Sequence, residues 1–260
     1  MRVGGGRVLL EQSCDGRVAT LTLSYPGKLN VVTMEMRRQI GEHFSRLDVD
    51  SQVRVVIVRG EGEHFSAGGD IAEFMESQAA DLTNLGHDIG APARSPKPVI
   101  AVVNGYCLGV GFELALCCDL RFATASSQFG LPEIRLGMIP GSGGTQRLAR
   151  YVGMSRAKFH VMTAGRIDGL QAERWGLVVK TAEDMAGLES EVGRTVDLLL
   201  SYSPLALRTA KEVLDQGCQG PLATGIELEG KAYAMLRSTE DFAEGVSAYL
   251  GKRSPAFKGR

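Results

Sequence analysis

The sequence predicts an α/β protein, because runs typical of buried strands alternate with segments of helical periodicity. Residues 53–58 and 99–103 are runs rich in β-branched side chains, the composition of parallel strands covered on both faces. Between residues 33 and 47, four apolar side chains recur at helical spacing: Met36, Ile40, Phe44 and Leu47. The order of strands and helix then recurs along the chain, which indicates a repeating unit without an obvious sequence repeat.

The first elements follow from local turn and capping signals. Asp15-Gly16 lies between two β-rich segments and predicts a hairpin of strands at residues 7–12 and 17–23. Thr33 is a candidate cap for the helix that follows it. The same kinds of pattern predict the later elements: helices at 79–94, 109–118, 145–151, 155–163 and 168–175, and strands at 120–124 and 177–180.

The last quarter of the chain is almost entirely helical in pattern. Pro204 lies near the first position of one predicted helix, where its missing N–H costs nothing. We therefore expect an α/β core over residues 1–200 and a C-terminal helical region over residues 201–260.

Charge and cysteine content narrow the classes of partner. The 29 basic and 30 acidic residues nearly cancel, so no global field would draw the protein to nucleic acid or to an anionic membrane. Five cysteines without a CxxC pair or a secretory segment suit a reducing cytoplasm. The histidines show no metal-ligand spacing, and no apolar run reaches the roughly 18 residues of a membrane helix. We expect a cytoplasmic protein with no metal, nucleic-acid or membrane partner.

Two glutamates lie in the most apolar part of the sequence. Glu113 belongs to a predicted helix that is apolar on nearly every face, so no polar face can turn it toward water. Glu133 follows Pro132 at a predicted helix start, where a glutamate is ordinary, and is less diagnostic by itself. Because a buried, unpaired carboxylate is costly, the two together predict a catalytic use.

Two glycine-rich loops each run into a predicted helix start. The first loop presents Ala67, Gly68 and Gly69, and the second presents Leu108, Gly109 and Val110. Backbone N–H groups at a helix start, together with the positive end of the helix dipole, can hold a developing oxyanion. Glycine also serves plain turn geometry, so either loop alone is ambiguous. Glu113, one turn beyond the second loop, favours the oxyanion interpretation.

Four motifs, in a fixed order, carry a resemblance to a known family. They are Phe-Ser-Ala-Gly-Gly-Asp-Ile at 65–71, the segment 98–119 with Asn104-Gly105 and Gly109-x-Gly111-x-Glu113, Phe-Gly-x-Pro-Glu at 129–133, and Pro-Gly-x-Gly-Gly-Thr-Gln-Arg at 140–147. With these motifs the sequence resembles the enoyl-CoA hydratase (crotonase) family. The resemblance extends from about Val8 into the tail that carries Lys252 and Lys258.

The resemblance implies a spiral core of repeated ββα units and a C-terminal helical region that assembles trimers, often paired into hexamers. It also implies an acyl-CoA substrate, with coenzyme A as part of the substrate and no separate cofactor. The thioester oxygen would lie between the backbone N–H groups of Gly69 and Val110. Of the two glutamates, Glu113 would mainly activate water and Glu133 would mainly deliver a proton.

The resemblance also implies where coenzyme A binds. Lys28 and Leu29 would line its nucleotide, and one C-terminal lysine would reach a phosphate, from a neighbouring subunit in an oligomer. The complete set of implied CoA-binding residues is Lys28, Leu29, Ala67, Gly68, Asp70, Ile71, Lys252 and Lys258. Val110 replaces the glycine that is commonest at its oxyanion position, so we expect a narrower pocket beside the thioester.

Three functions remain open from the sequence. The first is an enoyl-CoA hydratase that adds water across the C2–C3 double bond of a 2-enoyl-CoA. The second is an acyl-CoA hydrolase of the same fold, since the spacing of the glutamates does not separate the two reactions, and a 2,3-enoyl-CoA isomerase is a weaker variant. The third is a non-catalytic assembly or RNA-binding protein, which the near-neutral charge and the two retained glutamates disfavour.

Overall fold

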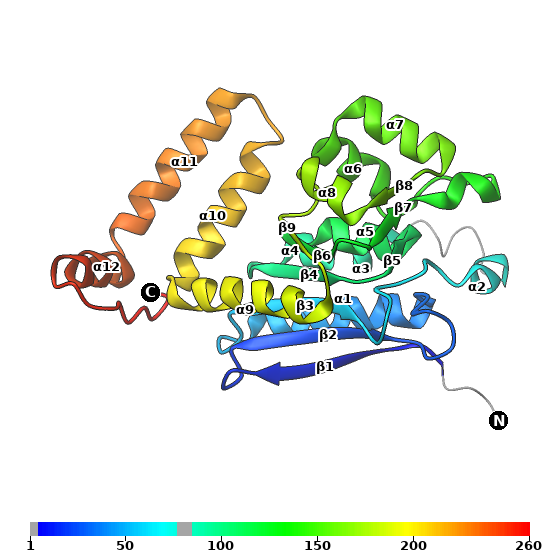
Figure 1. Cartoon of the computed structure of the whole chain (residues 1–260). Coiled ribbons are helices and arrows are strands. Elements are labelled where there is room, and N and C mark those ends of the chain that lie inside the picture. The colour runs from blue at the N-terminus through cyan, green and yellow to red at the C-terminus, as the bar shows by residue number, and fades with distance from the viewer. Residues whose placement is uncertain (1–4, 77–84) are drawn as a thin grey trace. The chain divides into compact units, whose positions relative to one another are not determined.

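The computed structural model describes residues 5–76 and 85–260 (Figure 1). Its internal contacts divide the chain into two units. The first comprises Met1–Ser95 and Val99–Gly193, and the second comprises Pro96–Pro98 and Arg194–Arg260. Each unit is described by itself.

A six-stranded sheet lies in the first unit, in the order β1-β2-β3-β4-β6-β9. β1 and β2 form an antiparallel hairpin, and each later pair is parallel. All five residues of β4 are buried, as its β-branched run predicts. The strands are β1 Arg7–Ser13, β2 Val18–Ser24, β3 Val55–Gly60, β4 Val99–Val103, β6 Leu120–Thr124 and β9 Lys180–Ala182.

A second sheet of three short strands has the order β5-β7-β8. β5 is Tyr106–Leu108, β7 is Gln128–Gly130 and β8 is Arg166–Asp168. β5 and β7 are parallel, and β8 is antiparallel to β7. Because β4 is followed by β5 and then a helix, and β6 is followed by β7 and then a helical turn, successive repeats contribute a strand to each sheet. The predicted α/β fold of repeated ββα units is therefore present.

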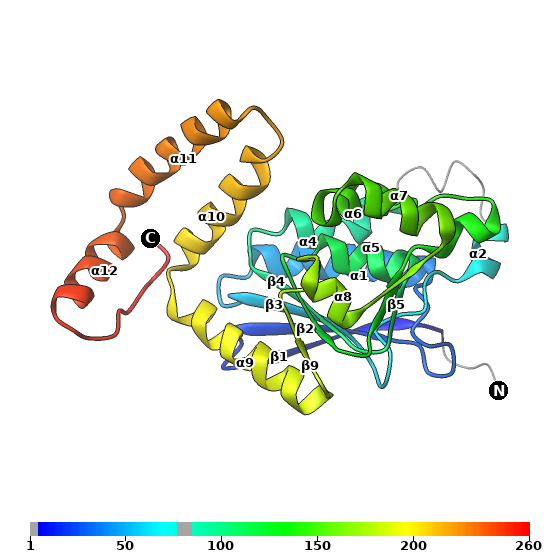
Figure 2. The same cartoon turned by 45° about the horizontal axis from the view of Figure 1, so that its top comes forward.

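The helices of the first unit occupy the connections between strands. In Figures 1 and 2, α6 and α7 lie side by side. The bounds are α1 Met34–Val49, α2 Ile71–Glu76, α3 Leu85–Ile89, α4 Ala91–Arg94, α5 Gly109–Cys117, the 3₁₀ helix η1 Pro132–Leu136, α6 Gly144–Val152, α7 Met154–Thr163 and α8 Gly169–Arg174; α9 Met185–Ser201 continues into the second unit.

Helix α1 confirms both its predicted cap and its predicted buried face. The Thr33 side chain accepts a hydrogen bond from the Met36 N–H, which satisfies one of the free donors of the first turn. The face that α1 turns inward includes the four predicted apolar residues and one cation. These buried residues are Met36, Arg37, Ile40, Phe44 and Leu47.

Two predicted segments differ from the structure. The first part of the predicted helix 79–94 lies outside the described residues, and the rest forms two short helices, α3 and α4. Pro92 has no N–H to continue a helix from α3, so the chain breaks at Gly90. The predicted strand 177–180 begins too early, because Leu177 and Val178 donate to the Ala172 carbonyl at the end of α8; β9 begins only at Lys180.

The second unit is helical in the described part of the chain. It contains α10 Pro204–Gly217, α11 Leu222–Arg237 and α12 Glu240–Leu250, and α10 and α11 lie side by side in both views (Figures 1 and 2). Pro204 begins α10, as the sequence predicts, and the side chain of Ser203 caps the helix. Asp241 is buried and accepts from the Ser203 hydroxyl and from the N–H groups of Lys258 and Gly259, which ties the tail to α12.

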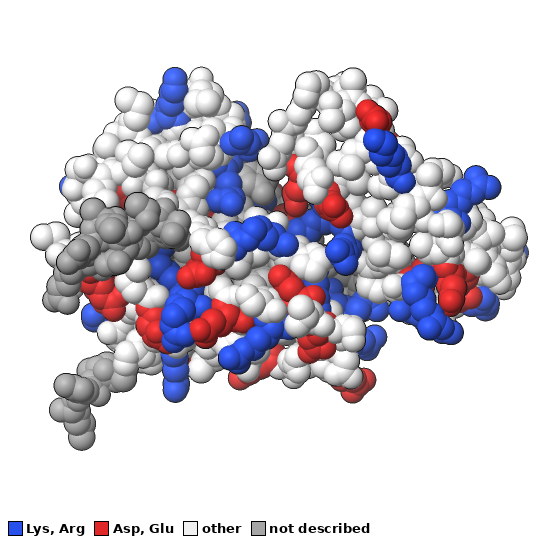
Figure 3. Space-filling model, turned by 180° about the vertical axis from the view of Figure 1, so that it is seen from behind, with Lys and Arg blue, Asp and Glu red and all other residues white. Residues whose placement is uncertain are grey.

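The surface carries charges of both signs. On the face seen in Figure 3, lysine and arginine side chains alternate with aspartate and glutamate over the described residues and do not gather into one stripe. Among the same described residues, none of the helices combines the length and the apolar composition needed to span a lipid bilayer.

A glycine in α5 provides a stability test of the fold. A Cβ at Gly111 would lie 2.5 Å from the Ser66 Cβ, so Gly111→Ala forces apart α5 and the first glycine-rich loop. We expect Gly111→Ala to lower the unfolding free energy by about 1–3 kcal/mol, measured by urea denaturation.

Gly193 in α9 is the matched control, since a Cβ there meets nothing within 4 Å. Gly193→Ala should raise the unfolding free energy by about 0.5–1 kcal/mol, the helix preference for alanine. Equal effects of the two substitutions would contradict the packing described for Gly111.

Candidate active site

Three extended segments run in parallel and end at one edge of the second sheet. Ser66 donates its N–H to the Tyr106 carbonyl at 2.8 Å, and its own carbonyl accepts the Leu108 N–H at 3.0 Å. β5 in turn pairs with β7, so that Leu108 lies opposite Gly130. Because the carboxyl ends of parallel strands meet at the same edge, the first glycine-rich loop, α5 and η1 all begin there.

Helix α5 begins with backbone donors that no side chain caps. Its N-cap residue, Leu108, makes no side-chain capping bond, and all nine helical residues are buried. Within residues 5–76 and 85–260, no acceptor receives the N–H of Gly69 or Val110. The two loops approach closely, since a Cβ at Gly109 would lie 3.4 Å from the Gly68 Cα. This arrangement suits an oxyanion at the helix start.

Glu113 is 2% exposed and is held by backbone donors. Its Oε1 accepts from the N–H of Ser142 at 2.7 Å and from the N–H of Gly144 at 2.9 Å. A Cβ at Gly144 would come within 3.0 Å of that oxygen, so glycine lets the loop approach the carboxyl group. Oε1 is thus fixed as an acceptor, and Oε2 receives no hydrogen bond from the described residues.

Glu133 lies in the first turn of η1, against the start of α5. A Cβ at Gly109 would lie 3.1 Å from Glu133 Oε1, and Oε2 is buried with no hydrogen-bond partner in the described part of the chain. Burial raises the pKa of Glu133 to about 7; a hydrogen bond from its own backbone N–H opposes this shift, and the charge of Glu113 adds to it. At neutral pH a large fraction of Glu133 therefore carries a proton.

The two carboxyl groups have different environments and different chemical capacities. Glu113 is oriented as a hydrogen-bond acceptor, whereas Glu133 retains a proton near neutral pH. Such a pair can take a proton from one reacting group and give a proton to another. The structure brings both glutamates to the edge where the free N–H groups of Gly69 and Val110 also lie.

Six of the eight predicted CoA-binding residues come from two neighbouring loops: Lys28, Leu29, Ala67, Gly68, Asp70 and Ile71. Lys28 Nζ and Asp70 Oδ2 form an ion pair at 2.9 Å, and the Ala67 N–H donates to the Leu29 carbonyl at 2.9 Å. The apolar side chains of Leu29 and Ile71 are each about half exposed. These loops therefore offer a cation and exposed apolar surface next to the free backbone donors.

The two C-terminal lysines belong to the second unit. Lys252 follows α12 with a positive φ, and the backbone N–H of Lys258 donates to Asp241 Oδ1 at 2.7 Å. The two loops belong to the first unit, so contact of these lysines with a phosphate of the same substrate stays a prediction.

Comparison with known proteins decides the family. A family profile described as enoyl-CoA hydratase/isomerase matches residues 14–260. The chain is 39% identical to the 2,3-dehydroadipyl-CoA hydratase of Escherichia coli, over 94% of this chain and 96% of that protein. It is 36% identical to the short-chain-enoyl-CoA hydratase of Clostridium acetobutylicum, over 97% of this chain and 98% of that protein. The chain belongs to the enoyl-CoA hydratase/isomerase family.

Solved structures agree with this assignment. An enoyl-CoA hydratase from Bacillus anthracis superposes with a TM-score of 0.92 at 33% identity, covering 98% of this chain and 100% of that chain. A second enoyl-CoA hydratase, from Mycobacterium tuberculosis, gives a TM-score of 0.90 at 29% identity, covering 98% and 99% of the two chains. The spiral α/β fold expected from the sequence motifs is thus confirmed, as is membership of an enzyme family.

The sequence did not identify the groups that form hydrogen bonds with Glu113. Ser142 and Gly144 were noted only as part of a motif, yet their N–H groups hold the carboxyl oxygen. Arg37 was not singled out, although it lies one turn before Ile40 and two turns before Phe44 on the buried face of α1. A cation at that helical position was a signal that could have been used.

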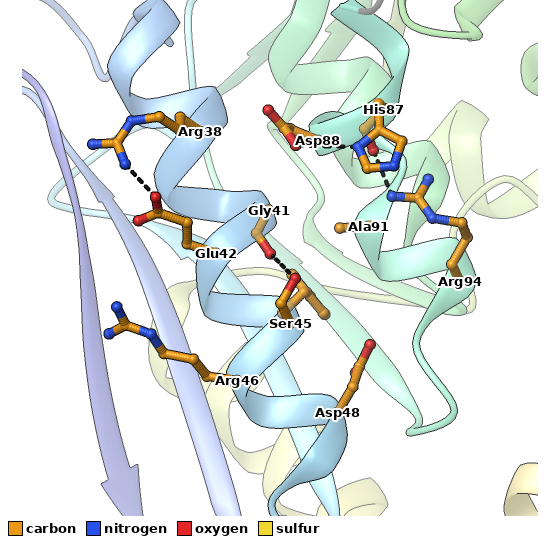
Figure 4. A pocket seen from close by; sticks show the side chains of 11 residues that line it. Arg38, Gly41, Glu42, Ser45, Arg46, Asp48, His87, Asp88, Ala91 and Arg94 are labelled. Carbon is orange, nitrogen blue, oxygen red and sulfur yellow. Dashed lines mark hydrogen bonds and ion pairs between the residues drawn. The ribbon is translucent and has the colours of Figure 1, made fainter.

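A cavity of about 560 Å³ lies between α1 and the helices α3 and α4. In Figure 4, Gly41 and Asp48 on α1 face Ala91 and Arg94 across it. Its charged groups are largely engaged with the chain itself, since Arg94 donates to the His87 carbonyl. Neither glutamate lines it, so this cavity is not part of the candidate active site.

The raised pKa of Glu133 predicts a pH-dependent stability difference from Glu133→Gln. The folded chain keeps a proton that the unfolded chain releases at the ordinary glutamate pKa of 4.5. The contribution of Glu133 to stability is therefore full below that pH and is lost as the pH rises through about 7. The rise of the pKa from 4.5 to about 7 corresponds to at most about 3 kcal/mol, and solvent screening of the partly exposed Glu133 reduces this value. Relative to wild type, the unfolding free energy of Glu133→Gln should therefore rise by on the order of 2 kcal/mol across this window.

The measurement is urea unfolding of both proteins at several pH values. Above pH 7 the difference should stay constant, because the carboxyl group is then ionised in the folded and unfolded chains alike. A difference that does not change with pH would show that Glu133 has no buried proton.

Proposed function

We propose that this protein is an enoyl-CoA hydratase, which adds water across the C2–C3 double bond of a 2-enoyl-CoA thioester. The observation that carries the proposal is the unequal pair of carboxyl groups. Glu113 is held as an acceptor by two backbone N–H groups, and Glu133 keeps a proton near neutral pH. Hydration needs one group of each kind, because a proton leaves water as another joins carbon.

The reaction begins with polarisation of the thioester. Its carbonyl oxygen accepts from the N–H groups of Gly69 and Val110, which draws electron density from the double bond and makes C3 electrophilic. Water bound at Glu113 Oε2 attacks C3 and gives its proton to that carboxylate. Electron density moves to the thioester oxygen as an enolate, which the two N–H groups stabilise. Glu133 then protonates C2, and proton return from Glu113 to Glu133 through solvent resets the site.

The substrate would bind with its coenzyme A portion across the two neighbouring loops. Lys28 supplies a cation for a phosphate, at the cost of its ion pair with Asp70, and the exposed Leu29 and Ile71 supply apolar contact. In this binding mode the isopropyl group of Val110, which is 4% exposed, would lie beside the thioester. We expect this group to favour acyl chains that are unbranched near the thioester.

We also propose a cytoplasmic location, and we propose that the protein assembles into a trimer or hexamer. The second unit supports assembly, because α11 has no buried side chain and several of its large apolar side chains are exposed. Large apolar side chains exposed in this way on two helices of one unit are typical of an interaction surface. They include Leu222, Ile226, Tyr233 and Met235 on α11, and Phe242, Tyr249 and Leu250 on α12. The proposal assigns this role to residues 201–260.

The function is tested by incubating the purified protein with crotonyl-CoA and following enoyl absorbance and free thiol together. Hydration removes the absorbance without releasing thiol. Thiol release, with crotonyl-CoA or with a saturated acyl-CoA, would instead identify a thioesterase, in which water attacks the thioester carbon.

Glu113→Gln and Glu133→Gln are the matched active-site variants for this assay. Each should lower kcat by at least about 100-fold, the scale of one general acid or base, while the folded structure is kept. Circular dichroism and the unfolding midpoint check the fold. Activity equal to wild type in either variant would remove that glutamate from the proposed mechanism.

A further inference from the structure

Arg37 is a buried cation that the mechanism above does not use. It lies on the inward face of α1, among Met36, Ile40 and Phe44, and is 4% exposed. Arginine is rarely buried to this degree without a charged or strongly polar partner, because its ion loses hydration. Its position in an apolar stripe therefore calls for a partner inside the protein.

The guanidinium group of Arg37 reaches Glu113 through one intervening residue. Arg37 Nη1 donates to the Ser142 hydroxyl at 3.1 Å, across 105 residues of sequence. The same Ser142 donates its N–H to Glu113 Oε1 at 2.7 Å. Arg147 Nη1 donates to the Ser142 carbonyl at 3.1 Å. Ser142 is thus held on both sides while it presents its N–H to the carboxyl group.

The positive charge of Arg37 also interacts with the negative charge of Glu113. Burial lowers the pKa of Arg37 to about 10, and the negative charges of Glu113, Asp88 and Glu73 oppose this effect. The group therefore remains a cation at neutral pH. A buried charge acts strongly on its neighbours, because little water screens it.

Resting on the proposed function, we propose that Arg37 is a positioning residue: through Ser142 it fixes the Glu113 carboxyl group in the orientation that activates water. Arg37 itself touches no reacting atom. Its effect should therefore appear in turnover, which depends on the placement of Glu113, and not in the binding of coenzyme A, which uses the loops at Lys28 and Ala67.

A second buried arginine provides a matched control. Arg121 in β6 is 3% exposed, and its guanidinium donates to the carbonyl groups of Leu177, Ala115 and Cys118. It has the same residue type and similar burial, but its partners are the carbonyl groups of Ala115 and Cys118 at the C-terminal end of α5 and of Leu177 after α8. Loss of Arg121 should reduce stability without a specific link to Glu113.

The test is a double-mutant cycle on hydration of a 2-enoyl-CoA. Arg37→Met should lower kcat by about 10-fold to 100-fold with little change in KM, as expected when a catalytic group is displaced by a fraction of an ångström to 1 Å. In the Glu113→Gln background the same substitution should cost no further kcat, because the group that it positions is already gone. Arg37→Lys, which keeps the charge, should recover part of the loss.

Arg121→Met is carried through the same cycle. If Arg121→Met lowers kcat, its fold-loss and the fold-loss of Glu113→Gln should multiply in the double variant, because the two residues act independently. If Arg37→Met does not fold, Ser142→Ala replaces it, since it removes the acceptor of Arg37 and keeps the N–H that Glu113 needs. Ser142→Ala should lower kcat by about 3-fold to 10-fold, again only when Glu113 is present.

The outcomes separate this inference from the proposed function. If the wild type hydrates the substrate and the losses of Arg37→Met and Glu113→Gln multiply fully, Arg37 has only a structural role and the inference is wrong. A rise in KM at unchanged kcat would overturn it as well. If the wild type does not hydrate any 2-enoyl-CoA, the proposed function itself fails and this inference fails with it.

Discussion

The candidate site depends on the parallel pairing of three short segments. Hydrogen bonds join Ser66 to β5, and β5 pairs with β7, although each strand has only three residues. The pairing sets one edge at which the first glycine-rich loop, α5 and η1 all begin. The glycines are consequences of this constraint: Gly111 lets α5 pack on Ser66, and Gly109 lets the carboxyl group of Glu133 approach α5. The pairing of these segments therefore brings two backbone donors and two carboxyl groups to the same edge of the sheet.

The difference between the two glutamates comes from their surroundings rather than from the residue type. Glu113 is the more deeply buried of the two, but it receives two backbone hydrogen bonds and faces a buried cation, Arg37. Glu133 is less buried, yet one of its oxygens has no partner among the described residues, and the charge of Glu113 adds to the cost of ionising it. Burial and an unpartnered oxygen therefore favour the protonated form of Glu133, although this group is less buried than Glu113.

The sequence predicted the parts of this arrangement that have a local signal. Thr33 as a cap, the buried β4 and the start of α5 follow from turn chemistry and periodicity, and Glu113 was conspicuous because no polar face was available to it. The strands β5, β7 and β8 were missed because three residues carry no periodicity. The contact of Ser142 with Glu113 and the link to Arg37 span about 30 and more than 100 residues, so only the folded chain shows them. The roles of the individual site residues stay predictions.

The central claim is that Glu133 holds the proton that hydration delivers to carbon. The pH dependence of kcat/KM for a 2-enoyl-CoA tests it most directly, because this ratio reports ionisations of the free enzyme. The account predicts that kcat/KM falls as the pH rises through about 7, where Glu133 loses its proton, and that Glu133→Gln lacks this decline at its lower activity. A wild-type kcat/KM that stays constant or rises through pH 7 would contradict the account.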